Sequence, residues 1–210
     1  MDLMTRRRAL MAQIGTVPEP ILPSEYQEVE YIESNGTQWI DTGIAIVTLA
    51  ALTTEWALRL IPTAVRTLIY AGVNASSKQI VSLSGRVRQD WAGRNSSYFS
   101  QNLKTDAVNT IMQKDGLFWL NEESVQINTT TSDVVTVYLF GKNMGDSPET
   151  GTLAWMRLYG FTAKTGSTKI ADFVPCYRKL DTKPGLYDLV SRSFITNQGT
   201  GEFVVGADVN

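Results

Sequence analysis

The sequence predicts an all-β protein, a sandwich or barrel of many short strands joined by turns. Three observations lead to this prediction. Trp56, Leu58 and Leu60 alternate with less apolar residues, which is the period of a half-buried strand. The pair Asp115-Gly116 separates two apolar runs, as the turn of a two-residue hairpin does. Beyond the first 25 or so residues, no stretch has the pattern of a long helix.

The first element, residues 1–15, is predicted to be a short N-terminal helix. Asp2 can cap its start and Gly15 can end it. An isolated helix of this length is marginal in water, so a partner is needed to order it. We expect an anchoring or assembly peptide, and a frayed tail is the alternative. The residues that carry this prediction are Leu3, Met4, Arg6, Arg7, Arg8, Leu10, Met11 and Ile14.

Residues 16–24 are predicted to be an extended linker. They contain Pro18, Pro20 and Pro23, and each proline prevents continuation of a helix. The remaining residues, 25–210, form the predicted globular domain. The chain is thus expected to consist of an anchor, a spacer and a head.

Within the head, strands are expected wherever apolar runs lie between turn signals. Asn35-Gly36 and the segment 183–185 are two of these signals. The predicted strands are 27–33, 37–41, 54–60, 66–72, 78–84, 86–91, 106–113, 117–121, 123–127, 134–140, 153–163, 169–177, 186–190 and 202–205.

Composition excludes several classes of function. The formal charge is -2, from 19 basic and 21 acidic residues, so bulk charge does not favour a nucleic-acid or anionic-membrane partner. The chain has no histidine, which removes the commonest general base and metal ligand. Its single cysteine, Cys176, cannot form an internal disulfide and is expected to be a buried apolar residue. No apolar run is long enough for a membrane span or a signal peptide.

Two groups of motifs at opposite ends of the head carry a family resemblance. The first is EYIESNGTQWIDTG at residues 30–43. The second comprises DFVPCYRK at 172–179, GLYD at 185–188 and FITN at 194–197. Together with VYLFGKN at 137–143 and LYGF at 158–161, they resemble the concanavalin A-like, laminin-G-like jelly-roll domains of virion and tail proteins from phages and prophages of gut bacteria. The resemblance covers roughly residues 23–206.

The resemblance implies a jelly-roll β-sandwich and a non-enzymatic virion structural protein. Decoration, head-fibre and tail-associated proteins all remain open. It further implies synthesis in the host bacterial cytoplasm, display on the virion surface, and contact with other virion proteins through the N-terminal segment. A homo-oligomer is expected, with a cell-surface or mucus glycan as a ligand of the head. In such jelly rolls the first and last strands usually pair, which would place the two groups of motifs side by side. A bacterial or prophage carbohydrate-binding adhesin is the alternative.

One polar and aromatic segment, 88–99, has the composition of a sugar-binding patch. Sugar sites combine aromatic rings with side chains that hydrogen-bond to hydroxyl groups, and this segment is broken by glycine. The alternative is that Trp91 and Phe99 are core residues of adjacent strands, or that the segment is a protein interface. The candidate ligand residues are Arg88, Asp90, Trp91, Arg94, Asn95 and Tyr98.

Catalytic and metal-binding alternatives have weak support in the sequence. A glucanase of this fold would need carboxylates that converge on one groove. The adjacent Glu122 and Glu123 would point to opposite faces of a strand. Calcium would need a cluster of oxygen ligands, and Asp133, Asp146 and Glu149 are only scattered loop acids. We therefore predict no catalytic residue, no metal site and no cofactor.

Overall fold

In the computed structural model, the described residues are 22–45, 51, 53–63, 69–71, 78–83, 86–91, 95–126, 136–143 and 153–209. Within these ranges the protein is all-β, without a helix. The predicted N-terminal helix and residues 16–21 of the predicted linker lie outside them. Leu22 is the first described residue, and its side chain is buried.

The described strands are, in chain order, β1 (Tyr26–Glu28), β2 (Ile32–Asn35), β3 (Ile40–Ala45), β4 (Thr54–Pro62), β5 (Ile69–Ala71), β6 (Lys78–Leu83), β7 (Arg86–Trp91), β8 (Asn95–Asn102), β9 (Asn109–Lys114), β10 (Leu117–Leu120), β11 (Glu123–Gln126), β12 (Thr136–Leu139), β13 (Trp155–Thr165), β14 (Thr168–Arg178), β15 (Lys183–Asp188), β16 (Ser193–Thr196) and β17 (Val204–Val205).

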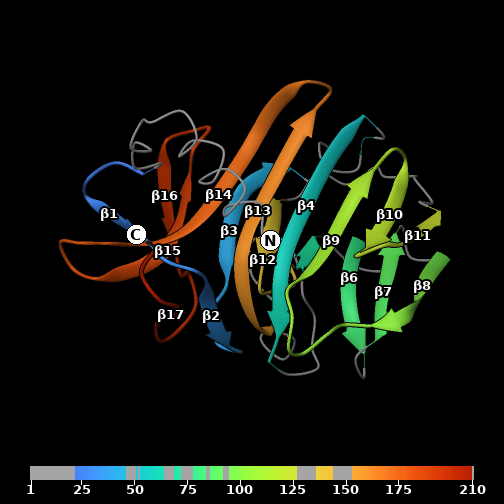
Figure 1. Cartoon of the computed structure of the whole chain (residues 1–210), viewed down its shortest axis with the longest axis horizontal. Coiled ribbons are helices and arrows are strands. Elements are labelled where there is room, and N and C mark those ends of the chain that lie inside the picture. The colour runs from blue at the N-terminus through green and yellow to red at the C-terminus, as the bar shows by residue number, and fades with distance from the viewer. Residues whose placement is uncertain are drawn as a thin grey trace, which may run out of the picture.

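These strands form two antiparallel sheets. The large sheet has the order β11-β10-β9-β4-β13-β14-β15-β16, with β1 on β14, and β2 between β13 and β17. The small sheet has the order β3-β12-β5-β6-β7-β8. Along the longest axis of the molecule, β1, β15 and β16 lie at one end and β6, β7 and β8 at the other (Figure 1).

The two sheets share one hydrophobic core, as in a β-sandwich. Leu58 and Phe161 of the large sheet and Phe99 and Leu139 of the small sheet all belong to it. Along β4, buried and half-buried residues alternate over the whole strand, so every second side chain faces the core. The predicted inward face of this strand, Trp56 with Leu58 and Leu60, is confirmed.

A second, smaller cluster lies where the chain enters the head. It buries Leu22, Val174, Cys176 and Tyr187, with Tyr26 packed against it. Cys176 is fully buried in β14, as predicted, and burial raises the pKa of its thiol to about 12. A thiol in this state is not a nucleophile near neutral pH.

The predicted hairpin at Asp115-Gly116 is confirmed. β9 and β10 pair directly across it, and Leu117 is the partner of Lys114. Asp115 and Gly116 have φ values of 53° and 71°. Two consecutive residues with positive φ match the right-handed twist of the flanking strands, which explains the choice of this dipeptide.

The two terminal groups of motifs lie side by side, as the resemblance implied. The backbone N–H of Trp39 donates to Asn197 Oδ1 at 3.1 Å, and Trp39 O accepts from the N–H of Gln198 at 2.9 Å. Val204 and Val205 of β17 pair with Glu33 and Ile32 of β2. The beginning and end of the head therefore close against each other.

Several strand predictions need correction. The predicted strand 27–33 is two strands, because the chain breaks from the ladder at residues 30 and 31 between β1 and β2. Strands β8 and β16 were not predicted at all. The predicted turn at 183–185 is wrong, because these residues pair with β14 and form the start of β15. β15 ends at Asp188, before the predicted end at 190. Asp188 ends it by folding the next residues into a turn.

Candidate functional site

The residues of the predicted N-terminal anchor lie outside the described residues. They are Leu3, Met4, Arg6, Arg7, Arg8, Leu10, Met11 and Ile14. The prediction that they attach the head to a partner stays a prediction.

The predicted ligand patch falls on the β7–β8 pair of the small sheet. Arg88 is the register partner of Tyr98, Asp90 that of Ser96, and Trp91 that of Asn95. Arg94 lies outside the described residues. At the end of the patch, Phe99 is fully buried and belongs to the core, as the alternative interpretation expected.

A different aromatic surface lies on the outer face of the large sheet. Met156 and Leu158 of β13 are buried in the core, so Trp155, Arg157 and Tyr159 lie on the opposite face of the strand. Trp155 is 43% exposed. We call this surface the aromatic platform, and it consists of Tyr31, Glu33, Trp155, Arg157, Tyr159 and Val204.

An ion pair lies at the centre of the platform. Arg157 of β13 and Glu33 of β2 are register partners, and Arg157 Nε donates to Glu33 Oε2 at 2.8 Å. This hydrogen bond raises the pKa of Arg157 above its ordinary value. Because both side chains remain partly exposed, the pair also offers donors and acceptors to a ligand.

Tyr31 is held between two neighbours. The Arg157 guanidinium carbon lies 4.8 Å from the centre of its ring, and the ring of Tyr159 lies 5.4 Å away. On another side the backbone of Gly206 approaches so closely that a Cβ there would lie 2.8 Å from ring atoms of Tyr31. The ring is therefore fixed by its surroundings before any ligand arrives.

The other end of the platform is Trp155, which packs against Gly36. A Cβ on Gly36 would lie 1.8 Å from Trp155 Nε1, and Gly36 has a φ of 89°. Glycine is thus required at this turn both for the backbone conformation and for the indole. Val204, 60% exposed on β17, pairs with Glu33 and extends the apolar surface across β2.

Three carboxylates whose pKa lies below the ordinary value have structural partners. Asp188 accepts from the backbone N–H groups of Asp172, Val190 and Ser191 and from the Ser191 hydroxyl. Burial alone would raise the pKa of Asp188, but the hydrogen bond from the Ser191 side chain and those from the backbone leave it below the ordinary value. Glu123 accepts from the N–H groups of Ser100 and Gln101, so it joins the edge of the large sheet to β8 of the small sheet.

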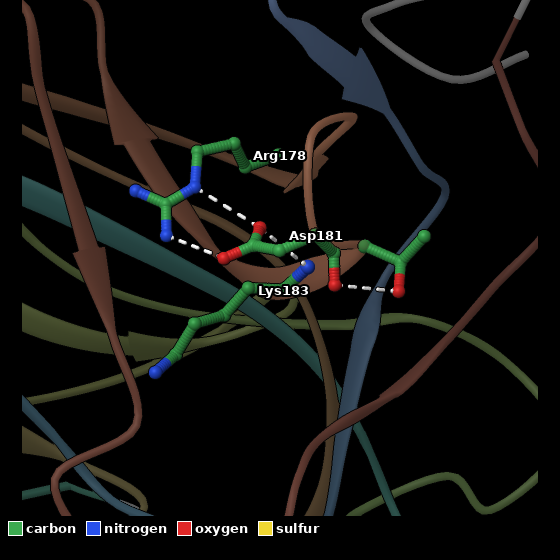
Figure 2. Close-up of polar contacts among 4 residues, drawn as sticks. Arg178, Asp181 and Lys183 are labelled. Carbon is green, nitrogen blue, oxygen red and sulfur yellow. Dashed lines mark hydrogen bonds and ion pairs between the residues drawn. The ribbon is translucent and has the colours of Figure 1, made fainter.

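The turn between β14 and β15 is braced by a third carboxylate. Arg178 donates to both oxygens of Asp181, at 3.0 and 2.6 Å, and the N–H of Lys183 donates to Asp181 Oδ1 at 3.3 Å (Figure 2). The bonds from Arg178 are the main reason that the pKa of Asp181 falls to about 2. This carboxylate therefore fixes the turn.

Metal ligands do not gather anywhere in the part of the chain that the structure describes. The loop acids considered for calcium, Asp133, Asp146 and Glu149, lie outside that part. Nor do its described segments contain a helix of the length and hydropathy that a bilayer span requires.

The sequence contained a partial signal for the platform. Residues 153–163 were predicted to form a strand, and the alternation of Trp155, Arg157 and Tyr159 with Met156 and Leu158 identifies an outward aromatic face. The placement of Tyr31 and Val204 beside them depends on pairing between distant strands, which local periodicity does not encode.

No protein-family model matches the chain, and no curated protein matches it.

Proposed function

We propose that the protein is a non-enzymatic display protein of a phage virion, whose head binds carbohydrate and whose N-terminal segment attaches it to the particle. The proposal for the head rests on one observation, the aromatic platform on the outer face of the large sheet. The proposal for the particle rests on the resemblance of the terminal motifs to phage jelly-roll domains. The antiparallel two-sheet architecture and the adjacent terminal motifs are compatible with that resemblance.

The platform suits carbohydrate because of its mixed chemistry. Aromatic rings such as Trp155 offer a rigid apolar surface to the C–H face of a sugar. The adjacent Arg157 and Glu33 provide hydrogen-bonding groups for hydroxyls. Binding without catalysis is proposed because Asp188, Glu123 and Asp181 are engaged in turns and sheet edges.

Replacement of Trp155 by alanine is expected to weaken binding of the cognate glycan at least tenfold, because an aromatic side chain that a ligand covers on binding commonly contributes about 2 kcal/mol or more. The measurement is a screen of the full chain on a glycan array, followed by titration calorimetry of the bound glycan with both proteins. Trp119→Ala is the matched control, since Trp119 is a half-buried tryptophan of β10, away from the platform. Equal affinity of Trp155→Ala and the parent chain would disprove the proposed site.

Deletion of residues 1–21 is expected to abolish incorporation into particles and leave the head folded. The deletion stops before Leu22 because this side chain is buried with Val174 and Tyr187. Cryo-EM and mass spectrometry of purified particles measure incorporation, and circular dichroism of the deleted chain checks the fold. Normal incorporation of the deleted chain would contradict the anchor. Absence of the full chain from every particle would favour a free bacterial or prophage adhesin instead.

A further inference from the structure

We infer that the aromatic platform binds an extended, uncharged oligosaccharide that lies along β13, rather than a single sugar or an anionic glycan. The inference rests on the proposed carbohydrate-binding function and specifies the class of ligand.

The first argument is the length of the platform. Trp155, Arg157 and Tyr159 follow each other at every second position of β13. Residues two apart in a regular strand are separated by about 6.7 Å, which is the spacing from Trp155 to Arg157. A bulge between Leu158 and Gly160 makes the next step irregular, but Tyr159 lies beyond Arg157, so the row is longer than this spacing. Such a row is longer than one pyranose ring. A single sugar would leave one of the two aromatic ends uncovered.

The second argument is the order of chemistry along the row. Trp155 forms one end, Tyr31 with Tyr159 forms the other, and the Arg157–Glu33 pair lies between them. An oligosaccharide presents apolar ring faces that repeat along its length, with hydroxyls at their edges. Two aromatic contacts separated by a polar centre match that repetition better than they match a compact ligand.

The third argument is charge. Within the platform, Arg157 is the cation and Glu33 the anion, and they are in direct contact at 2.8 Å. A carboxylated or sulfated sugar would have to compete with Glu33 for the guanidinium and would approach the Glu33 carboxylate. Like charges at such distances are repulsive, so the platform discriminates against anionic glycans.

The fourth argument is that the platform is formed in advance. Gly36 and Gly206 leave the space that Trp155 and Tyr31 occupy, and any side chain at either position would displace a ring. A surface fixed in this way loses little conformational entropy on binding, which favours a ligand of matching shape.

The experiment titrates the full chain by calorimetry with glucose, maltotriose, maltohexaose, cellohexaose and the hexamer of N-acetylglucosamine, and with the trimer and hexamer of galacturonic acid as anionic probes. We expect at least one neutral hexamer to bind tenfold or more tightly than its monosaccharide, with little change between 0.05 and 0.5 M salt. Trp155→Ala and Tyr159→Ala should each reduce that affinity at least tenfold. Trp155→Phe, which keeps an aromatic ring, should reduce it less, and Trp119→Ala should not change it.

The outcomes separate this inference from the proposed function. Equal affinity for the monosaccharide and the hexamer would overturn the extended ligand. Tighter, salt-sensitive binding of galacturonate oligomers would overturn the uncharged ligand. In both cases a loss of binding in Trp155→Ala would leave the proposed carbohydrate site standing. Failure of every probe to bind would overturn the inference together with the carbohydrate-binding function.

Discussion

Replacing Gln38 with alanine is expected to lower the free energy of unfolding by about 2 to 4 kcal/mol, because it removes a buried side chain and leaves buried polar groups unpaired. Gln38 is 1% exposed. Its Oε1 accepts from Ser34 Oγ and from the N–H of Asn35, each at 3.0 Å. Its Nε2 donates to the carbonyl of Glu202 at 3.1 Å, across 164 positions of sequence.

The large effect follows from what Gln38 connects. The side chain joins the turn after β2 to the segment before β17, so alanine would remove the partner of the Ser34 hydroxyl, the Asn35 N–H and the Glu202 carbonyl. Urea unfolding of the parent chain and the variant measures the difference. Gln198→Ala is the control, since Gln198 is exposed and is expected to change stability by no more than about 0.5 kcal/mol. If the two variants were equally stable, the proposed importance of this buried connection would be wrong.

Replacing Leu58 with alanine is expected to cost about 3 to 5 kcal/mol, the range for a leucine that leaves a cavity in a packed core. Leu58 is fully buried near the middle of β4, a strand paired on both sides by β9 and β13. Its neighbours cannot collapse into the space without moving these ladders. Thermal and urea unfolding of the variant provide the measurement.

The control for Leu58 is on the outer face of the same strand. Glu55→Ala removes a partly exposed ion pair with Lys164 Nζ, which lies 3.0 Å from Glu55 Oε2. Because such pairs are screened by solvent, the expected change is below about 1 kcal/mol. A cost for Leu58→Ala similar to that for Glu55→Ala would argue against the observed orientation of β4.

The parts of the fold that were predictable from sequence are those specified by neighbouring residues. The alternation from Trp56 to Leu60 determines which side of β4 is buried. The pair Asp115-Gly116 determines a hairpin, because the positive φ values of the turn suit these two residues.

The missed strands have little local signal. β8 has the sequence NSSYFSQN, and its serines and asparagines have low strand propensity. It becomes a strand through pairing with β7, a tertiary contact. β16 contains Phe194, Ile195 and Thr196, which favour strands, but it is only four residues long, too short to be recognised without its pairing with β15.

The candidate site was likewise predictable from the sequence only in part. An outward row of Trp155, Arg157 and Tyr159 can be derived from the alternation of β13. The contribution of Tyr31, Glu33 and Val204 cannot be derived in this way. β2 pairs with β13 and β17 pairs with β2, and both pairings join segments that are far apart in the sequence. The described residues of the segment chosen from composition alone, 88–99, fall on β7 and β8 of the small sheet.

The position of β2 between β13 and β17 has a consequence for synthesis of the chain. β2 is made early, yet both of its hydrogen-bonding edges are paired with strands that leave the ribosome late, β13 and then β17. Until then its backbone donors and acceptors face solvent. Its contacts with β13 and β17 join residues about 120 or more positions apart. Such non-local closure slows folding and exposes unpaired edges to other nascent chains. The head is therefore expected to fold after release of its last residues, and loss of the few residues that form β17 would leave β2 with an open edge.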